Sequence, residues 1–133
     1  MKSCLILTGG KLNLAFARSF LEKEHFDKVI AVDGGLESAE ALGITPDYIV
    51  GDFDTVSGEV VERFRNLPFI VWEQHKPEKN ETDTELARSR ALTLGCEKLV
   101  FLGATGGRLD HMLGNLHALY ACLEKGIDAS LVD

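Results

Sequence analysis

The chain has 133 residues and a mass of 14.6 kDa, which is the size of one domain with one hydrophobic core. Hydrophobic residues make up 45% of it and charged residues 26%, the usage of an ordinary globular protein, so disorder is excluded. No apolar run is longer than six residues, as at residues 99–104, which is far shorter than the roughly 18 residues that span a membrane.

The net charge is −7, because 21 acidic residues outnumber 14 basic ones. Proteins that bind duplex nucleic acid carry a basic surface, so this class is disfavoured. A polyphosphate ligand would be repelled unless a divalent cation lay between its phosphates and the carboxylates. The net charge therefore makes any phosphate-binding function depend on a metal ion.

The cysteines Cys4, Cys96 and Cys122 lie in apolar runs and show no CxxC spacing. Free thiols in such runs behave as small hydrophobic side chains. The chain also has no apolar segment long enough for a signal peptide. We expect a cytoplasmic protein with no membrane segment.

Short β-rich runs alternate with segments of helical spacing. Strands are predicted over residues 3–7, 28–32, 48–50, 69–72, 98–102 and 129–132. Helices are predicted around residues 14–21 and 36–39, from the capping box at 82–85 to about 95, and along the apolar stripe 109–123. Phe16, Phe20 and Trp72 are expected in the core.

This alternation predicts the α/β class: a Rossmann-like three-layer domain with a mostly parallel sheet of about six strands and helices on both faces. No linker or repeat interrupts the pattern, so we expect one domain over residues 1–133. Such sheets bind ligands beyond the carboxyl ends of their strands, so the segments that follow the strands are the ones to examine.

These segments repeat glycine and aspartate. They are residues 8–10 (Thr-Gly-Gly), 33–35 (Asp-Gly-Gly), 51–55 (Gly-Asp-Phe-Asp-Thr) and 103–111 (Gly-Ala-Thr-Gly-Gly-Arg-Leu-Asp-His). With the acid that opens the helix after the fourth strand, five carboxylates are expected to converge at one edge of the sheet. They are Asp33, Asp52, Asp54, Asp83 and Asp110.

Several of these residues also have a purely local explanation. Asp33 before two glycines is an ordinary turn residue, and Asp110 suits a helix N-cap. Asp83 is favoured in a first helical turn by the helix dipole, and Thr82 is explained by the capping box.

The pair Asp52 and Asp54 is more specific. Residues two apart on leaving a strand point to the same side, so both carboxylates come together. Their repulsion favours recruitment of a cation, and Mg²⁺ prefers such oxygen ligands.

The glycine loops admit two interpretations. Gly106 and Gly107 followed by Arg108 suit a phosphate clamp, because a guanidinium would lie beside exposed backbone N–H groups. For Gly9 and Gly10, tight turning and anion binding remain equally open. Neither a P-loop nor a GxGxxG fingerprint is present.

Taken together in chain order, these motifs resemble those of the thiamine pyrophosphokinase family. The resemblance rests on Asp33-Gly34-Gly35, Pro46-Asp47 leading into residues 51–54, Thr82-Asp83, and residues 106–111, and it covers nearly the whole chain. It implies an enzyme that transfers the pyrophosphoryl group of ATP to the hydroxyl of thiamine, giving thiamine diphosphate and AMP, with Mg²⁺ as cofactor.

The resemblance also implies roles for residues. Asp52, Asp54 and Asp83 would hold the metal, and these three with Asp110 would form the catalytic set. Asp33 and Asp110 would line the same cleft. The ATP-binding set would be Asp33, Thr82, Thr105, Gly106, Gly107 and Arg108.

Two departures from the family pattern stand out. Thr55 replaces the serine that usually follows the second aspartate of the GDFD motif, which keeps the hydroxyl. Family members also continue into a second, β-rich domain that completes the thiamine pocket, generally across a homodimer, and this domain is absent from the 133 residues. A homodimer is expected.

Two other functions remain as alternatives. Residues 52–56 also fit the DxDx[TV] pattern of phosphohydrolases, in which Asp52 would be the nucleophile, although that pattern normally follows the first strand rather than the third. A nucleotide-binding domain without catalysis is the second alternative.

Overall fold

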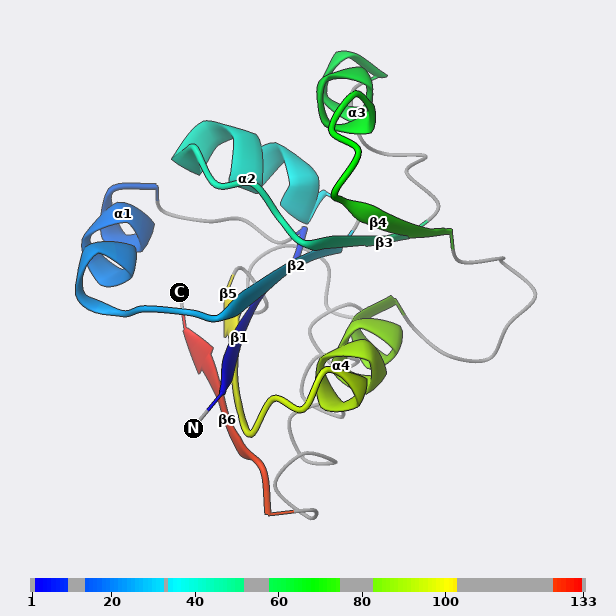
Figure 1. The fold of residues 1–133 in the computed structure, drawn as a ribbon. Coiled ribbons are helices and arrows are strands. Elements are labelled where there is room, and N and C mark those ends of the chain that lie inside the picture. Colours follow the sequence, from blue (N-terminus) through cyan, green and yellow to red (C-terminus); the bar gives the residue numbers. More distant parts are fainter. Residues whose placement is uncertain are drawn as a thin grey trace.

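The computed structural model describes residues 2–9, 14–32, 34–51, 58–74, 83–102 and 126–132. Within them, six strands form one parallel sheet in the order β4-β3-β2-β1-β5-β6 (Figure 1). The strands are β1 (Ser3–Leu7), β2 (Lys28–Val32), β3 (Tyr48–Gly51), β4 (Val71–Gln74), β5 (Lys98–Leu102) and β6 (Asp128–Val132). The predicted α/β class with a parallel sheet is confirmed.

The central strands β1 and β5 are buried and apolar beyond their first residues, Ser3 and Lys98. All five residues of β1 are buried, and β5 is buried from Leu99 to Leu102. Leu5 of β1 lies opposite Val29 of β2 on one side and Val100 of β5 on the other. Continuous apolar runs are typical of parallel strands that are covered on both faces.

The helices divide between the two faces of the sheet. They are α1 (Leu14–Lys23), α2 (Gly35–Leu42), α3 (Gly58–Arg65) and α4 (Asp83–Thr93). Helices α1, α2 and α3 lie on one face and α4 lies on the other (Figure 1). The predicted helix over residues 109–123 lies outside the described residues.

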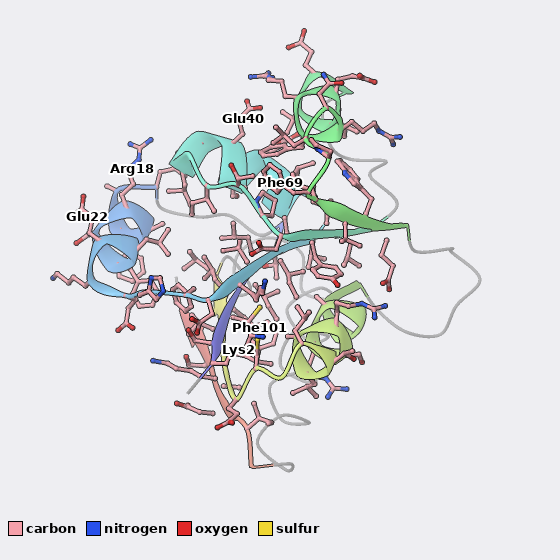
Figure 2. The ribbon with its side chains drawn as sticks, viewed as in Figure 1. Lys2, Arg18, Glu22, Glu40, Phe69 and Phe101 are labelled. Carbon is pink, nitrogen blue, oxygen red and sulfur yellow. The ribbon has the colours of Figure 1, made fainter. Side chains whose placement is uncertain are left out.

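Each face has its own hydrophobic cluster. On the side of α1, α2 and α3, Leu36 and Phe64 belong to one cluster with Leu5 and Leu7 of β1. On the other side, the cluster combines Ala87 and Ala91 of α4 with strand residues Cys4, Ile6, Ile30, Val32, Val50, Leu99 and Phe101. Phe101 is fully buried between the sheet and α4 (Figure 2).

Helix α2 ends at Leu42, directly before Gly43. Gly43 takes the left-handed conformation, with φ at 72°, and its N–H donates to the carbonyls of Ala39 and Glu40. This is the usual glycine ending of a helix, and it turns the chain into β3.

Two aspartates fasten the amino ends of the strands. The backbone N–H of Ser3 donates to Asp27 Oδ2 at 2.8 Å, and the N–H of Asp27 donates to the carbonyl of Ser3 at 3.0 Å. Asp47 Oδ2 accepts from the N–H of Val29 at 2.9 Å, and the carbonyl of Asp47 accepts from the N–H of Val71 at 3.0 Å. Asp27 thus joins β1 to β2, and Asp47 joins β2 and β4 at the start of β3.

Three details differ from the expectations. Helix α3 was not predicted, because only Val60 and Phe64 of its residues are buried among charged neighbours. Strand β4 begins at Val71 instead of Phe69, since its start is set by the bond from Val71 to Asp47. Phe16 is 40% exposed on α1 and stacks on Phe20, so its assignment to the core is wrong.

The cysteines within the described residues are free and buried. Cys4 is fully buried and Cys96 is 2% exposed. Burial raises the pKa of both thiols, so they are neutral near pH 7 and act as small hydrophobic groups, as expected. Cys122 lies outside the described residues.

No helix in the described part of the chain is both long and apolar enough to pass through a membrane.

Candidate active site

The topology brings the strands that precede the candidate segments to one edge of the sheet. Because all paired strands are parallel, β1, β2, β3 and β5 end at the same edge, which we call the carboxyl edge. The strand order reverses between β1 and β5, since β2 to β4 lie on one side of β1, and β5 and β6 lie on the other. Ligands of open α/β sheets bind beyond the strand ends at such a switch point.

Thr8 holds the ends of β1 and β5 together at the switch point. Its N–H donates to the carbonyl of Leu102 at 3.0 Å, and its hydroxyl donates to the same oxygen at 3.3 Å. Thr8 is only 4% exposed. Both polar groups are satisfied internally, so Thr8 fixes the ends of the two strands relative to each other.

The loops that follow β1 and β2 touch through their backbones. A Cβ on Gly9 would lie 3.3 Å from the Cα of Gly34, and a Cβ on Gly35 would lie 2.0 Å from the carbonyl oxygen of Leu7. No side chain fits at Gly35 without a backbone shift. Gly34 is also the N-cap of α2, so this close approach fixes where α2 begins.

This contact supplies a reason for two of the glycine motifs. The sequence left tight turning and anion binding equally open for Gly9, and the structure shows backbone packing against Gly34. The signal in the sequence was the repetition of Gly-Gly after two strands that turn out to be neighbours.

Gly51 is the last residue of β3 and directly precedes the acid-rich segment in the sequence. It is buried at the end of β3, and its φ of 140° lies in a region that other residues rarely adopt. Asp52 follows directly in the sequence. The glycine of the Gly-Asp-Phe-Asp motif is therefore required by the backbone, independently of any ligand.

The structure describes the backbone of one predicted site residue, Asp83. Asp83 is the first residue of α4, where the helix dipole favours a negative charge. The other predicted residues lie outside the described part of the chain: Asp33, Asp52, Asp54, Thr82, Thr105, Gly106, Gly107, Arg108 and Asp110. Three of them adjoin described residues in the sequence, because Asp33 follows Val32, Asp52 follows Gly51 and Thr82 precedes Asp83.

The side chains proposed as metal ligands are likewise not among the described ones. Within the described side chains, no three His, Cys, Asp or Glu residues gather into a metal-binding group. The donor chemistry nevertheless suits Mg²⁺, since Asp52, Asp54 and Asp83 offer only carboxylate oxygens. The structure describes the backbone next to two of these positions: β3 ends at Gly51, directly before Asp52, and α4 begins at Asp83.

Pro46 and Asp47 belong to the scaffold rather than to the carboxyl edge. They precede β3, at the opposite end of the strand from Gly51. Pro46 is fully buried, and Asp47 binds the backbones of β2 and β4. This part of the motif pattern serves strand alignment.

Helix α4 is fastened to the sheet by an ion pair between Arg90 and Glu73 of β4. Both side chains are about a third exposed or less. The pair helps to hold α4, and with it the position of Asp83, against the sheet.

The fold and the carboxyl edge define an open, parallel α/β protein with its ligand region at a topological switch point. Residues 21–131 match the family described as thiamin pyrophosphokinase, catalytic domain, and the chain belongs to this family.

Named relatives agree with this assignment. Thiamine pyrophosphokinase of Bacillus subtilis is 33% identical over 133 residues, which is 100% of this chain and 61% of the relative. Thiamine pyrophosphokinase 1 of Arabidopsis thaliana is 35% identical over 117 residues, covering 73% of this chain and 44% of the relative. The chain thus spans less than two thirds of these relatives.

Solved structures show the same fold. The crystal structure of thiamine pyrophosphokinase from Bacillus subtilis matches with a TM-score of 0.82 and 29% identity, over 99% of this chain and 61% of that one. Thiamin pyrophosphokinase from Geobacillus thermodenitrificans matches with a TM-score of 0.76 and 29% identity, over 100% of this chain and 60% of that one.

Proposed function

We propose that residues 1–133 form the ATP- and metal-binding catalytic part of a thiamine pyrophosphokinase. The match of residues 21–131 to this catalytic domain family carries the proposal. The arrangement of the carboxyl edge supports it, because the glycine- and aspartate-rich segments follow strands that end side by side.

The reaction joins two substrates, ATP and thiamine. The hydroxyl oxygen of thiamine forms a bond to the β-phosphorus of ATP while the bond from that phosphorus to the bridging oxygen of AMP breaks. AMP keeps the bridging oxygen, and the attacking hydroxyl loses its proton. Such transfers depend mainly on alignment of the two substrates and on neutralisation of charge on the phosphoryl oxygens.

We assign roles to the residues at the carboxyl edge accordingly. Asp52, Asp54 and Asp83 hold Mg²⁺, which when bound neutralises phosphate charge. Arg108 and Thr82 contact the phosphates or the nucleotide, and the loop residues Thr105, Gly106 and Gly107 contribute backbone N–H groups. Asp33 and Asp110 line the cleft, and Asp110 completes the catalytic set.

We further propose that the thiamine pocket is completed by a β-rich domain of the kind the family has, across a homodimer. The free buried thiols Cys4 and Cys96 are compatible with a reducing compartment such as the cytoplasm. The alternative of an aspartyl phosphohydrolase is not favoured, because the family match accounts for the motifs of all the strand ends together.

Calorimetric titration tests the metal-dependent part of this function. ATP titrated in excess Mg²⁺ should bind about tenfold more tightly, or better, than in chelator, because without the cation the carboxylates repel the polyphosphate. Equal affinity under both conditions would contradict the metal assignment.

Release of AMP that depends on added thiamine tests the transfer itself. Tight Mg-ATP binding without such release, in a chain that includes the β-rich domain, would favour the non-catalytic alternative, and a trapped phosphoenzyme would favour the phosphohydrolase.

A further inference from the structure

The ion pair between Arg90 of α4 and Glu73 of β4 joins a helix to the edge strand of the sheet. Arg90 Nη2 donates to Glu73 Oε1, and the exposed fractions of the two side chains are 32% and 26%. Because most of each side chain is shielded from water, salt screens this pair less than an ordinary surface pair. It can therefore hold α4 and β4 in one relative position.

The apolar contacts of α4 leave this task to the ion pair. The helix contributes Ala87 and Ala91 to a cluster with residues of β1, β2, β3 and β5. Among the described residues, that cluster contains none from β4. An alanine side chain makes few contacts, so it resists sliding or turning of a helix less than a large side chain does.

Helix α4 begins towards the carboxyl edge. A short turn after its last residue, the chain is at the amino edge, where the N–H of Glu97 donates to the carbonyl of Lys2 at 2.8 Å. The 11 residues of α4 rise about 16 Å, and strands of 4 or 5 residues span about 13–17 Å. The helix therefore spans the height of the sheet, with Asp83 at the end nearer the carboxyl edge.

Asp83 and Arg90 occupy the same face of α4. They are about two helical turns apart, and Ala87 lies between them on that face. Ala87 is fully buried in the cluster against the sheet. The backbone position of Asp83 is therefore on the sheet-facing side, and a rotation of α4 that moved Arg90 would move this position as well.

Glu73 lies beside the strand that leads to the other proposed metal ligands. It is opposite Val50 of β3. The next residue of β3 is Gly51, which directly precedes Asp52 in the sequence. The ion pair thus connects the strand that precedes Asp52, through its neighbour β4, with the helix that begins at Asp83.

We propose that Glu73 and Arg90 are positioning residues for the metal site. Their ion pair sets the place of the first turn of α4, which carries Asp83, relative to the end of β3, which Asp52 follows. They act through the backbones of β4 and α4 and not by contact with the metal ion. This inference rests on the proposed function, because it requires Asp52 and Asp83 to share one Mg²⁺.

The Mg²⁺ concentration that gives half of the full effect on ATP binding reports on the metal site. Calorimetric ATP titrations at a series of Mg²⁺ concentrations measure it for the parent chain, Glu73→Gln and Arg90→Gln. We expect each variant to need about tenfold more Mg²⁺, the usual cost of losing a residue that orients metal ligands. Affinity for ATP in chelator should be unchanged.

The sign of the two effects separates positioning from charge. Glu73→Gln removes a negative charge and Arg90→Gln a positive one, so a through-space effect would weaken Mg²⁺ binding in the first and strengthen it in the second. Loss of position weakens it in both. The double variant should be no weaker than either single variant, because the two residues share one interaction. Opposite effects of the single variants, or effects that add in the double variant, would overturn the proposal.

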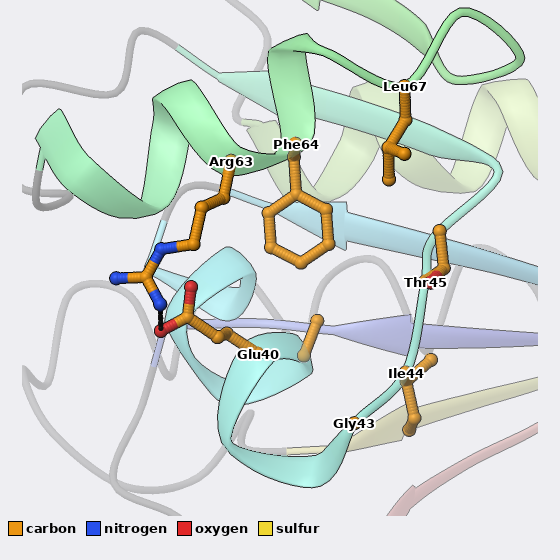
Figure 3. A pocket seen from close by; sticks show the side chains of 8 residues that line it. Glu40, Gly43, Ile44, Thr45, Arg63, Phe64 and Leu67 are labelled. Atoms are coloured by element: carbon orange, nitrogen blue, oxygen red, sulfur yellow. Dashed lines mark ion pairs between the residues drawn. The ribbon is translucent and has the colours of Figure 1, made fainter.

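The ion pair between Glu40 of α2 and Arg63 of α3 provides a matched control (Figure 3). Glu40 Oε1 lies 3.0 Å from Arg63 Nη1, and the exposed fraction of Glu40, 31%, is similar to that of Glu73. This pair joins two helices on the opposite face of the sheet from α4 (Figure 1). Glu40→Gln should therefore keep the Mg²⁺ requirement within about twofold of the parent, as expected of a remote, screened charge, even if its melting temperature falls.

Two further comparisons keep the test decisive. Arg90→Lys keeps the charge and a donor for Glu73, so it should have a smaller effect than Arg90→Gln, and it replaces that variant if the latter does not fold. A parent chain without Mg²⁺-dependent ATP binding would contradict the proposed function, and this inference with it. A Mg²⁺-dependent parent whose Glu73 and Arg90 variants behave like Glu40→Gln would contradict this inference alone.

Discussion

Aspartates serve two purposes in this chain, and their position along the strands separates them. Asp27 and Asp47 precede strands and bind backbone N–H groups of neighbouring strands. Asp52 follows a strand, directly after Gly51, whose φ of 140° favours glycine. The carboxylates at the amino ends of strands are satisfied by the scaffold, and we propose that those following the strands serve a ligand.

Asp27→Asn tests the scaffold role. The backbone N–H of Ser3 lowers the pKa of Asp27, so the stabilisation is present above the unfolded value near 3.8 and is lost as the pH falls through the folded pKa. The variant should melt at a lower temperature than the parent at pH 7, and the difference should shrink as the pH falls below 3.8.

Thermal melts between pH 7 and pH 3 provide the measurement. Asp128→Asn is the control, because Asp128 is exposed and its side chain makes no hydrogen bond within the described part of the chain. A difference for Asp27→Asn that does not vary with pH would contradict the charge-based explanation.

At the scale of helices and strands, the sequence predicts strands with continuous apolar runs. It misses element boundaries that depend on contacts between residues far apart in the chain. The buried strands are visible because both faces of each are apolar, as in β1 and β5. The start of β4 was misplaced because Asp47, more than twenty residues earlier, sets it. Helix α3 shows only a narrow buried stripe through Val60 and Phe64.

The junction of β1 with α2 gives a prediction at this scale. Gly35→Ala places a methyl group 2.0 Å from the carbonyl oxygen of Leu7, so the backbone must shift, and we expect a loss of about 2–3 kcal/mol in the free energy of unfolding.

Gly58→Ala at the start of α3 is the matched control. A Cβ there meets no atom within 4 Å, so this change should be neutral or should stabilise by about 0.5 kcal/mol. Urea unfolding of both variants measures the difference. Similar free energies for the two would show that the loops of β1 and β2 do not pack as described.

At the scale of the whole molecule, the two edges of the sheet are built differently. The amino edge is closed by aspartate–backbone bonds, and the carboxyl edge is assembled from glycine-containing loops that touch one another. The sequence predicted which strands end at the carboxyl edge, because a parallel sheet brings their carboxyl ends to one side. It did not predict the Gly9–Gly34 contact, which depends on neighbouring strands and a tight backbone approach.

The same limit applies to the proposed site. Strand order assigns Asp52 and Asp33 to segments that leave neighbouring strands, since β3 pairs with β2. The distances between their carboxylates depend on loop conformation, which no local pattern encodes. Ligand binding and global stability therefore offer the most direct test of whether these acids work together.

The Asp52→Asn, Asp54→Asn double variant keeps side-chain volume while removing two charges. Repulsion between unliganded carboxylates is relieved, so the variant without ligand should be at least as stable as the parent. With Mg-ATP at about 100 times its Kd, the parent should gain about 2.7 kcal/mol and melt roughly 10 °C higher, and the variant should lose this gain.

The Glu59→Gln, Glu62→Gln variant is the control, since it removes two charges from exposed positions of α3 and should keep the full gain. Thermal melts with and without Mg-ATP decide the matter: a double aspartate variant that unfolds more easily yet still gains stability from Mg-ATP would mean that Asp52 and Asp54 support the fold and not the metal.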